Sequence, residues 1–277
     1  MGLATDFLDL LLPQTCAGCA RPRALLCDTC ASCLTAVPRP AWPSPVPKGL
    51  PRPWTACAYE GPVRSIIAAH KEHGRTSLAA PLGEALARAA RTALSHTPTP
   101  ATGPDVRTVH RVHTVPATGL HSTRATGGRV PPGTDGHVAP GAGLRGPPGA
   151  GVLLVPVPSG RGAVRRRGHD PTRRMAEAAA ARLRTAGTAV SVLQALRQRR
   201  RVLDQAGLPV GRRAANLAGA LEVVPSAAVA GRTVVLVDDV ITTGATLAEA
   251  ARALREAGAA VVAAATVAAT PRRRPAR

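Results

Sequence analysis

The sequence predicts an α/β protein in which helices flank a parallel sheet, with a small four-cysteine module near the N-terminus. Two short apolar runs, 152–155 and 234–237, have the length and continuity of strands that are buried on both faces of a parallel sheet. Segments of helical periodicity follow them, and such alternation of strand and helix is typical of α/β folds. Four cysteines within the stretch 16–30 indicate a separate metal-binding unit.

We expect six segments along the 277 residues. In order, they are an N-terminal helix with the cysteine module (1–36), a proline-rich linker (37–53), the N-terminal part of the main domain (54–94), a disordered low-complexity insertion (95–151), the core of the main domain (152–269) and a basic tail (270–277). Pro, Gly, Thr and His dominate the insertion. Such a composition buries too little apolar surface to offset the entropy of ordering the chain.

Strands and helices alternate through the main domain. The apolar patterns predict strands at 54–59, 152–157, 188–193, 221–224, 233–237 and 260–267. They predict helices that begin near Pro62, at Leu78, at Pro171 and at Leu247. Proline is favoured in the first turn of a helix, which supports two of these starts. The Arg-rich stretch 197–213 is too irregular for either kind of element.

The composition limits the classes of function. A formal net charge of +20 attracts polyanions in general, whether nucleic acid, anionic lipid or phosphorylated small molecules. Only two Trp, one Tyr and one Phe are present, which disfavours the stacking platforms of single-strand-binding proteins. No apolar run approaches the roughly 18 residues of a membrane span. The first residues lack the basic start of a signal peptide, so we expect a cytoplasmic protein.

Four cysteines have the spacing of a zinc site. Cys16 and Cys19 form one Cys-x2-Cys pair, and Cys27 and Cys30 form a second pair after seven intervening residues. Four thiolates close a tetrahedral site and leave no open position, so the zinc would stabilise the module and do no chemistry. Two alternatives stay open: a redox pair, and Cys33 in place of Cys30 as a ligand.

The segment 234–246 has the order of groups that a sugar phosphate needs. Asp238 and Asp239 end an apolar run, where the carboxyl ends of parallel strands place ligands. A small, hydroxyl-rich loop then leads into a helix, and its backbone N–H groups can surround a phosphate. The residues of this loop are Thr242, Thr243, Gly244, Ala245 and Thr246. In the plainer alternative, the acids only cap the helix through an ordinary turn.

This segment resembles the phosphoribosyl pyrophosphate (PRPP) motif of type I phosphoribosyltransferases. The resemblance implies a type I phosphoribosyltransferase-like fold, PRPP binding with Mg²⁺, and glycosyl transfer that releases pyrophosphate. We expect the acid pair to hold the ribose hydroxyls or the metal, and the loop to hold the 5′-phosphate. The turn after the first core strand, Val157, Pro158 and Ser159, would bind pyrophosphate together with Arg167. A solvated Arg cluster is the alternative there.

A wider resemblance is to the ComF family, whose members are associated with natural competence. The cysteine module, a helix with a Lys, Pro-Val-Pro, an Arg-Gly motif and the PRPP motif occur here in that family's order. In the mobile loop that would cover the site, Gln205, Arg213 and Asn216 match the family pattern. After Arg167-Gly168 the family usually has Phe-Asn-Gln, whereas this chain has His169-Asp170-Pro171.

Three hypotheses follow from the resemblance. The first is a phosphoribosyltransferase-domain protein that binds PRPP or a related ribose phosphate and transfers the phosphoribosyl group. The second is a non-catalytic accessory of DNA uptake that contacts single-stranded DNA or a helicase partner. The third is a PRPP-sensing regulator. The sequence identifies neither an acceptor nor an oligomeric state.

Overall fold

The computed structural model describes residues 15–22, 24–97, 151–159, 164–165, 167–199 and 219–271. The expected N-terminal helix, nearly all of the expected insertion and the loop positions Gln205, Arg213 and Asn216 lie outside these residues. All described residues belong to one of the two units into which the chain divides, the unit made of Met1–Thr97 and Gly143–Arg277.

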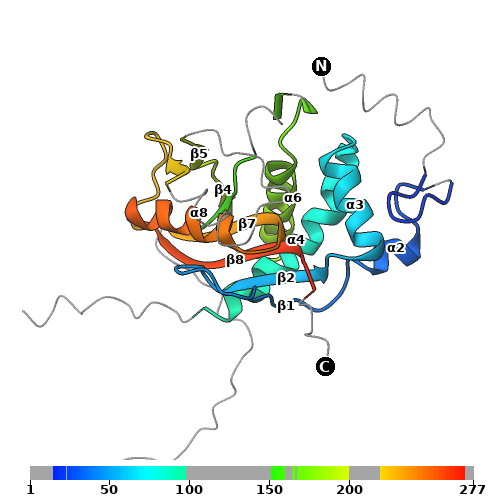
Figure 1. The fold of residues 1–277 in the computed structure, drawn as a ribbon, viewed down its shortest axis with the longest axis horizontal. Helices are drawn as coiled ribbons and strands as arrows, with labels where there is room; N and C mark the ends of the chain where they lie inside the picture. Colours follow the sequence, from blue (N-terminus) through cyan, green and yellow to red (C-terminus); the bar gives the residue numbers. More distant parts are fainter. Residues whose placement is uncertain are drawn as a thin grey trace, which may run out of the picture. The chain divides into compact units, whose positions relative to one another are not determined.

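A six-stranded sheet, in the order β1-β2-β8-β7-β3-β4, forms the centre of this unit (Figure 1). Its strands are β1 (Arg39–Pro40), β2 (Pro53–Ala58), β3 (Val152–Pro156), β4 (Val190–Val192), β7 (Thr233–Ile241) and β8 (Ala260–Ala269). Only β1 pairs antiparallel, and the other neighbours pair parallel. The predicted α/β fold with a mostly parallel sheet is therefore confirmed.

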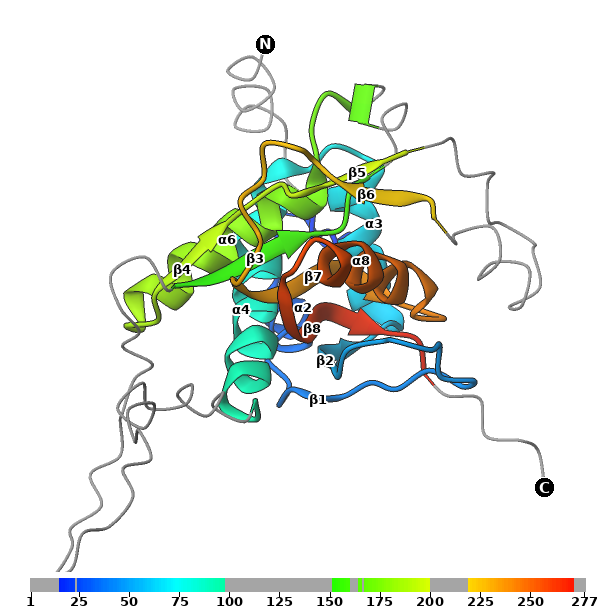
Figure 2. The same ribbon diagram turned by 90° about the vertical axis from the view of Figure 1, so that its left-hand side faces the viewer.

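Helices cover both faces of the sheet. Helices α4 (Ala79–Ser95) and α6 (Pro171–Thr185) lie on one side and α8 (Ala245–Glu256) on the other (Figure 2). Alternate residues of β7 point to the two layers, because side chains of a strand alternate in direction. Val235 and Val237 join the core under α4 and α6, whereas Val234 and Leu236 join the core under α8.

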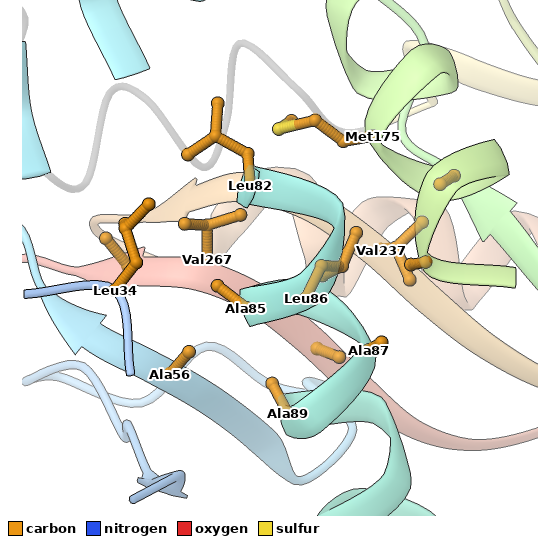
Figure 3. Close-up of a cluster of buried hydrophobic side chains, with 14 of the residues drawn as sticks. Leu34, Ala56, Leu82, Ala85, Leu86, Ala87, Ala89, Met175, Val237 and Val267 are labelled. Carbon is orange, nitrogen blue, oxygen red and sulfur yellow. The ribbon is translucent and has the colours of Figure 1, made fainter. Parts of the chain in front are cut away.

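The core under α4 is built from small and branched aliphatic side chains, as the shortage of aromatics requires. Figure 3 shows Leu82 and Leu86 of α4 among side chains of β7, β8 and α6. Gly83 allows α4 to approach α6 closely, since a Cβ there would lie 2.4 Å from the Cβ of Ala178. The small side chains thus let α4 and α6 pack at short range.

The smaller elements surround this framework. They are α2 (Asp28–Ser32) in the cysteine module, α3 (Gly61–Lys71), the 3-10 turn η1 (Thr76–Leu78), and the antiparallel pair β5 (Leu196–Gln198) and β6 (Leu221–Val223). The cysteine module lies beside α3 (Figure 1). Arg75, just beyond α3, donates to the carbonyl of Thr15 at 2.7 Å. A Cβ on Gly18 would lie 3.1 Å from the Cβ of Pro62, so the module and the start of α3 are in close contact.

The structure places part of the proline-rich segment 37–53 in the fold itself. Residues Arg39–Pro40 form β1 at the edge of the sheet, and Leu50 is buried against the α8 layer. Proline is tolerated at a sheet edge, where a missing N–H breaks no internal ladder. The segment predicted as a linker therefore also covers one side of the domain.

Strand β7 is longer than the sequence pattern predicts. The apolar run ends at Val237, but the strand continues through the acid pair to Ile241. Asp238 and Val240 align in parallel register with Thr266 and Ala268 of β8, so pairing with a neighbour extends the strand.

Among the described residues, no helix is both long enough and apolar enough to cross a bilayer.

Candidate functional site

The site lies where the sheet changes its direction of winding. From β3 the chain passes through α6 to β4 on one side, whereas from β7 it passes through α8 to β8 on the other. Strands β3 and β7 are adjacent and parallel, so their carboxyl ends meet between the diverging connections. In open α/β sheets this point is where ligands bind.

A pocket of about 500 Å³ occupies this position. Predicted residues from both phosphate-binding loops and the acid pair line it: Val157, Pro158, Ser159, Arg167, Asp238, Asp239, Thr242 and Thr246. The end of α3 closes another side with Lys71 and Glu72. Segments far apart in the sequence therefore meet in one cavity.

A second hollow of about 910 Å³ adjoins the first at Thr242. Residues of β1, the following loop and the ends of β7 and β8 line it, with Arg39 and Glu60 as its charged residues. It contains neither member of the acid pair. Of these two hollows, only the pocket of about 500 Å³ is lined by the acid pair.

The acid pair is held by backbone donors and by one lysine. Asp239 is buried, and its carboxylate accepts from Lys71 Nζ at 2.5 Å and from the N–H of Val240 at 2.8 Å. Asp238 accepts from the N–H of Asp239 at 2.8 Å. Adjacent residues of an ideal strand point to opposite faces, yet both acids line the pocket.

The pKa values of Asp238 and Lys71 are both shifted from their usual ranges. Burial, followed by the charge of Asp239, raises the pKa of Asp238 well above its usual range. Burial lowers the pKa of Lys71, but the charge and hydrogen bond of Asp239 outweigh it, so the net pKa of Lys71 is raised. Lys71 is therefore a cation at neutral pH, and Asp238 binds a proton more readily than an exposed aspartate does.

The turn after β7 has a glycine in a left-handed conformation directly before a helix. Gly244 adopts a left-handed conformation, with φ at 72°, immediately before the first residue of α8. A Cβ at this position would also lie 3.1 Å from Leu50 and 3.2 Å from Pro43. Gly244 brings no side chain to cap the helix, and the N–H of Ala245, the first residue of α8, donates to Thr243 Oγ1 at 3.4 Å. Backbone N–H groups at the start of a helix are suited to hold an anion.

The loop after β3 holds the second group of polar residues. Val157 donates its N–H to Val237 at 2.9 Å, which keeps this loop beside the end of β7. Ser159 Oγ lies 3.4 Å from the carboxylate of Asp170, which caps α6 by accepting from the N–H of Arg173. Arg167 pairs with Glu72 at 2.6 Å.

Sequence reasoning did not place Lys71, Glu72 and Tyr59 in the site, although all three line the pocket. Lys71 was expected near a helix end, but no motif connects it with Asp239, 168 positions away. Tyr59, the only tyrosine of the chain, follows β2, whose carboxyl end reaches the same edge of the sheet. The common direction of the parallel strands is the one signal that could have indicated Tyr59.

The four predicted zinc ligands form one cluster. The Sγ atoms of Cys16, Cys19, Cys27 and Cys30 all lie within 4.8 Å of one another. Cys27 Sγ lies 3.7 Å from that of Cys16 and 3.6 Å from that of Cys19. Tetrahedral zinc with bonds of about 2.3 Å requires sulfur separations of roughly 3.8 Å, so the cluster can hold a zinc ion. Cys33 lies outside the cluster and donates to the carbonyl of Thr29.

Comparison with protein families agrees with this geometry. Residues 175–277 match the family model of the phosphoribosyl transferase domain. The match supports a type I phosphoribosyltransferase domain. Within the domain, the matched region contains the acid pair and the turn before α8, whereas Lys71, Arg167 and the cysteine cluster precede it. No curated protein shows a significant match to the chain.

Proposed function

We propose that the pocket binds PRPP or a related ribose phosphate together with Mg²⁺, and that the domain transfers the phosphoribosyl group with release of pyrophosphate. One observation carries the proposal: the acid pair, the turn before α8 and the loop with Arg167 line a single cavity at the winding change of the sheet. A ribose with phosphates at both ends needs these three groups together.

Each part of the ligand has a matching part of the pocket. Asp238 and Asp239 take the ribose hydroxyls or the metal, because carboxylates accept hydrogen bonds from a diol. The turn 242–246 takes the 5′-phosphate at the start of α8. Residues 157–159 and Arg167 take the pyrophosphate, with the N–H groups and guanidinium as donors.

The charge of the pocket favours a metal-bound ligand. Among its described lining residues, three are acids (Glu72, Asp238 and Asp239) and two are bases (Lys71 and Arg167). With all five charged, their sum is −1, and with Asp238 protonated it is zero, so the pocket offers no net positive charge to a bare polyanion. Carboxylates and phosphates are the ligands that Mg²⁺ prefers, so the donor set fits this ion. When bound, Mg²⁺ would neutralise part of the negative charge of the departing pyrophosphate.

The residues act by positioning and electrostatics. Transfer breaks the bond between C1 of the ribose and the pyrophosphate oxygen, whose electron pair leaves with pyrophosphate. The lone pair of an acceptor nitrogen or oxygen then bonds to C1, and the proton that the acceptor carried is released to water. Positive charge develops on the sugar while the C1–O bond breaks. The acid pair stabilises this charge, and Arg167 stabilises the departing anion. We assign no general base.

A titration of PRPP tests the proposal. In calorimetry with Mg²⁺ we expect the wild-type chain to bind PRPP, and Asp238→Asn/Asp239→Asn to lose binding. Glu84→Gln/Glu177→Gln changes the net charge equally on α4 and α6, outside the lining of the pocket, and should bind as the wild type does. Incubation with candidate bases should release pyrophosphate. Equal binding by the acid-pair variant would refute the assigned site.

The outcome also separates the alternatives. PRPP binding without pyrophosphate release for any acceptor would favour a PRPP-sensing regulator. Steeply salt-dependent DNA binding that is independent of PRPP and survives the acid-pair substitutions would favour the accessory of DNA uptake. The ComF resemblance supports either role, because the order of its motifs includes both the cysteine module and the PRPP pocket.

We also propose that the cysteine cluster binds one structural zinc ion. Its four thiols leave no open coordination position, and the module packs on α3, which ends at Lys71 and is followed by Glu72. The metal would therefore stabilise one wall of the pocket from outside. It would take no part in the reaction.

A further inference from the structure

Two consecutive residues at the end of α3 form ion pairs with two different parts of the pocket. Lys71, the last residue of the helix, pairs with Asp239 on β7. Glu72, which follows it, pairs with Arg167 before α6 at 2.6 Å. The Arg167 side chain is only 17% exposed, whereas that of Glu72 is 50% exposed. Asp239 in one predicted sub-site and Arg167 in the other are thus already paired with an opposite charge of the protein itself.

Two buried histidines hold the Arg167 loop against α3. Nε2 of His70 lies 3.2 Å from the carbonyl of Pro171, and Nε2 of His169 lies 3.4 Å from the carbonyl of His70. Nδ1 of His169 lies 3.1 Å from the carbonyl of Arg167. These contacts join the end of α3 to the start of α6 on the side of Arg167. The backbone on both sides of the Glu72–Arg167 pair is therefore held by packing between the two helices.

The pair has a direct consequence for an anionic ligand. A phosphate that binds Arg167 either replaces the carboxylate of Glu72 or lies beside it, and like charges repel at this range. A ligand with one phosphate group gains little from the exchange, because it substitutes one anion for another. A diphosphate that brings a divalent cation offers more charge and more acceptor atoms.

We propose that Glu72 determines the specificity of the pocket by occupying Arg167 in the free protein, so that a diphosphate displaces it and a single phosphate does not. This deepens the proposed function and rests on it, since it assigns Arg167 to the pyrophosphate group. Glu72 acts through Arg167 and touches no reacting atom. It is a residue that sets which anions the site accepts.

A different role would give the opposite result. If Glu72 only held Arg167 in the orientation that the ligand needs, removing the carboxylate would weaken binding. If Glu72 occupies Arg167 in competition with the ligand, removing it strengthens binding. The sign of the change in affinity therefore decides between these roles.

The experiment measures the affinity of the full chain for inorganic pyrophosphate with Mg²⁺, and for inorganic phosphate, by calorimetry. We expect Glu72→Gln to bind pyrophosphate about two- to fivefold more tightly, as expected for loss of one competing exposed ion pair. Phosphate should gain at least as much, so the preference for pyrophosphate falls. In an Arg167→Gln background, Glu72→Gln should change neither affinity, because the two residues act as one unit.

Glu84→Gln is the matched control. Glu84 pairs with Arg182 on the outside of α4 and α6, and its side chain is 47% exposed, close to the value for Glu72. It changes the net charge by the same amount and should leave both affinities unchanged. Unchanged or weaker binding by Glu72→Gln would overturn the inference, and PRPP binding that depends on the acid pair would then still support the proposed function. If the wild type binds neither pyrophosphate nor PRPP, both proposals fail.

Discussion

Lys71 and Asp239 form an ion pair across the pocket, with Nζ 2.5 Å from Oδ2, although 168 positions separate them in the chain. Asp239 lies in the central strand β7 and Lys71 at the end of α3, so the contact joins the sheet to a helix at the rim. The Asp239 side chain is 8% exposed and that of Lys71 is 38% exposed. Water can solvate the lysine but hardly reaches the carboxylate, so loss of the pair would cost the charge of Asp239 more than the charge of Lys71.

Lys71→Met should destabilise the protein, because it leaves the buried charge of Asp239 without its cation. A fully buried pair loses about 3–5 kcal/mol when one partner is removed, and partial exposure of Lys71 reduces the expected loss to roughly 1–3 kcal/mol. Urea denaturation measures the loss. The exposed Lys48 supplies the control Lys48→Met, which should have little effect. Equal stability of the two variants would contradict the importance of the pair.

Gly244→Ala should reduce both stability and phosphate binding. The substitution forces a side chain into a left-handed backbone and against Leu50 and Pro43, which should cost roughly 1–3 kcal/mol. Gly258→Ala is the matched control, since φ is 82° there but the nearest atom to its Cβ is 3.4 Å away. Denaturation should show a loss for both variants, whereas calorimetry with PRPP should show weaker binding for Gly244→Ala alone. Normal binding by Gly244→Ala would argue against a phosphate at this turn.

Cys19→Ser should abolish stoichiometric zinc binding, because a tetrahedral site loses one of four thiolates. Elemental analysis of the purified chain should give about one zinc per wild-type molecule. The control Cys33→Ser removes a cysteine of the same module that lies outside the cluster, and it should keep the metal. Loss of zinc from Cys33→Ser but not from Cys19→Ser would exchange their assigned roles. Chelation should lower the melting temperature of the wild type and leave Cys19→Ser unchanged.

His70 should make the free energy of unfolding decrease as the pH is lowered through the acidic range. Burial lowers the pKa of His70, and this outweighs the two carbonyl contacts that raise it. Below about pH 6.5 the unfolded chain binds a proton that the folded chain resists, so falling pH favours unfolding. Denaturation between pH 7.5 and 5.5 should show a shallower dependence for His70→Gln than for the wild type. The exposed residue His73 gives the control His73→Gln, and an identical slope in all three proteins would refute this source of pH dependence.

Much of the framework could be predicted from the sequence because it depends on local pattern. Continuous aliphatic runs identified the buried strands, and Asp170 with Pro171 marked the start of α6. Chain direction then explains why residues 157–159 and 238–246 meet, since the carboxyl ends of neighbouring parallel strands share one edge. The assignment of these residues to a ligand stays a prediction.

Other features depend on contacts that no local pattern contains. Acids are uncommon in strands, so β7 was expected to end at Val237, but its register with β8 continues to Ile241. Prolines indicated a linker at 37–53, yet an edge strand accepts them. Lys71 and Glu72 belong to an ordinary helix end, and only packing of α3 against the rim brings them to the pocket.

The neighbours of β2 constrain when the protein can fold during synthesis. Strand β2 is made early, and its parallel partner β8 is the last strand among the described residues, with Trp54 aligned to Ala265. Until β8 has left the ribosome, the edge of β2 that pairs with it has no hydrogen-bonding partner. The pocket wall that continues from β2 into α3 must therefore wait for β8, so ribosomal stalling before residue 260 should yield a chaperone client and not a partly folded domain.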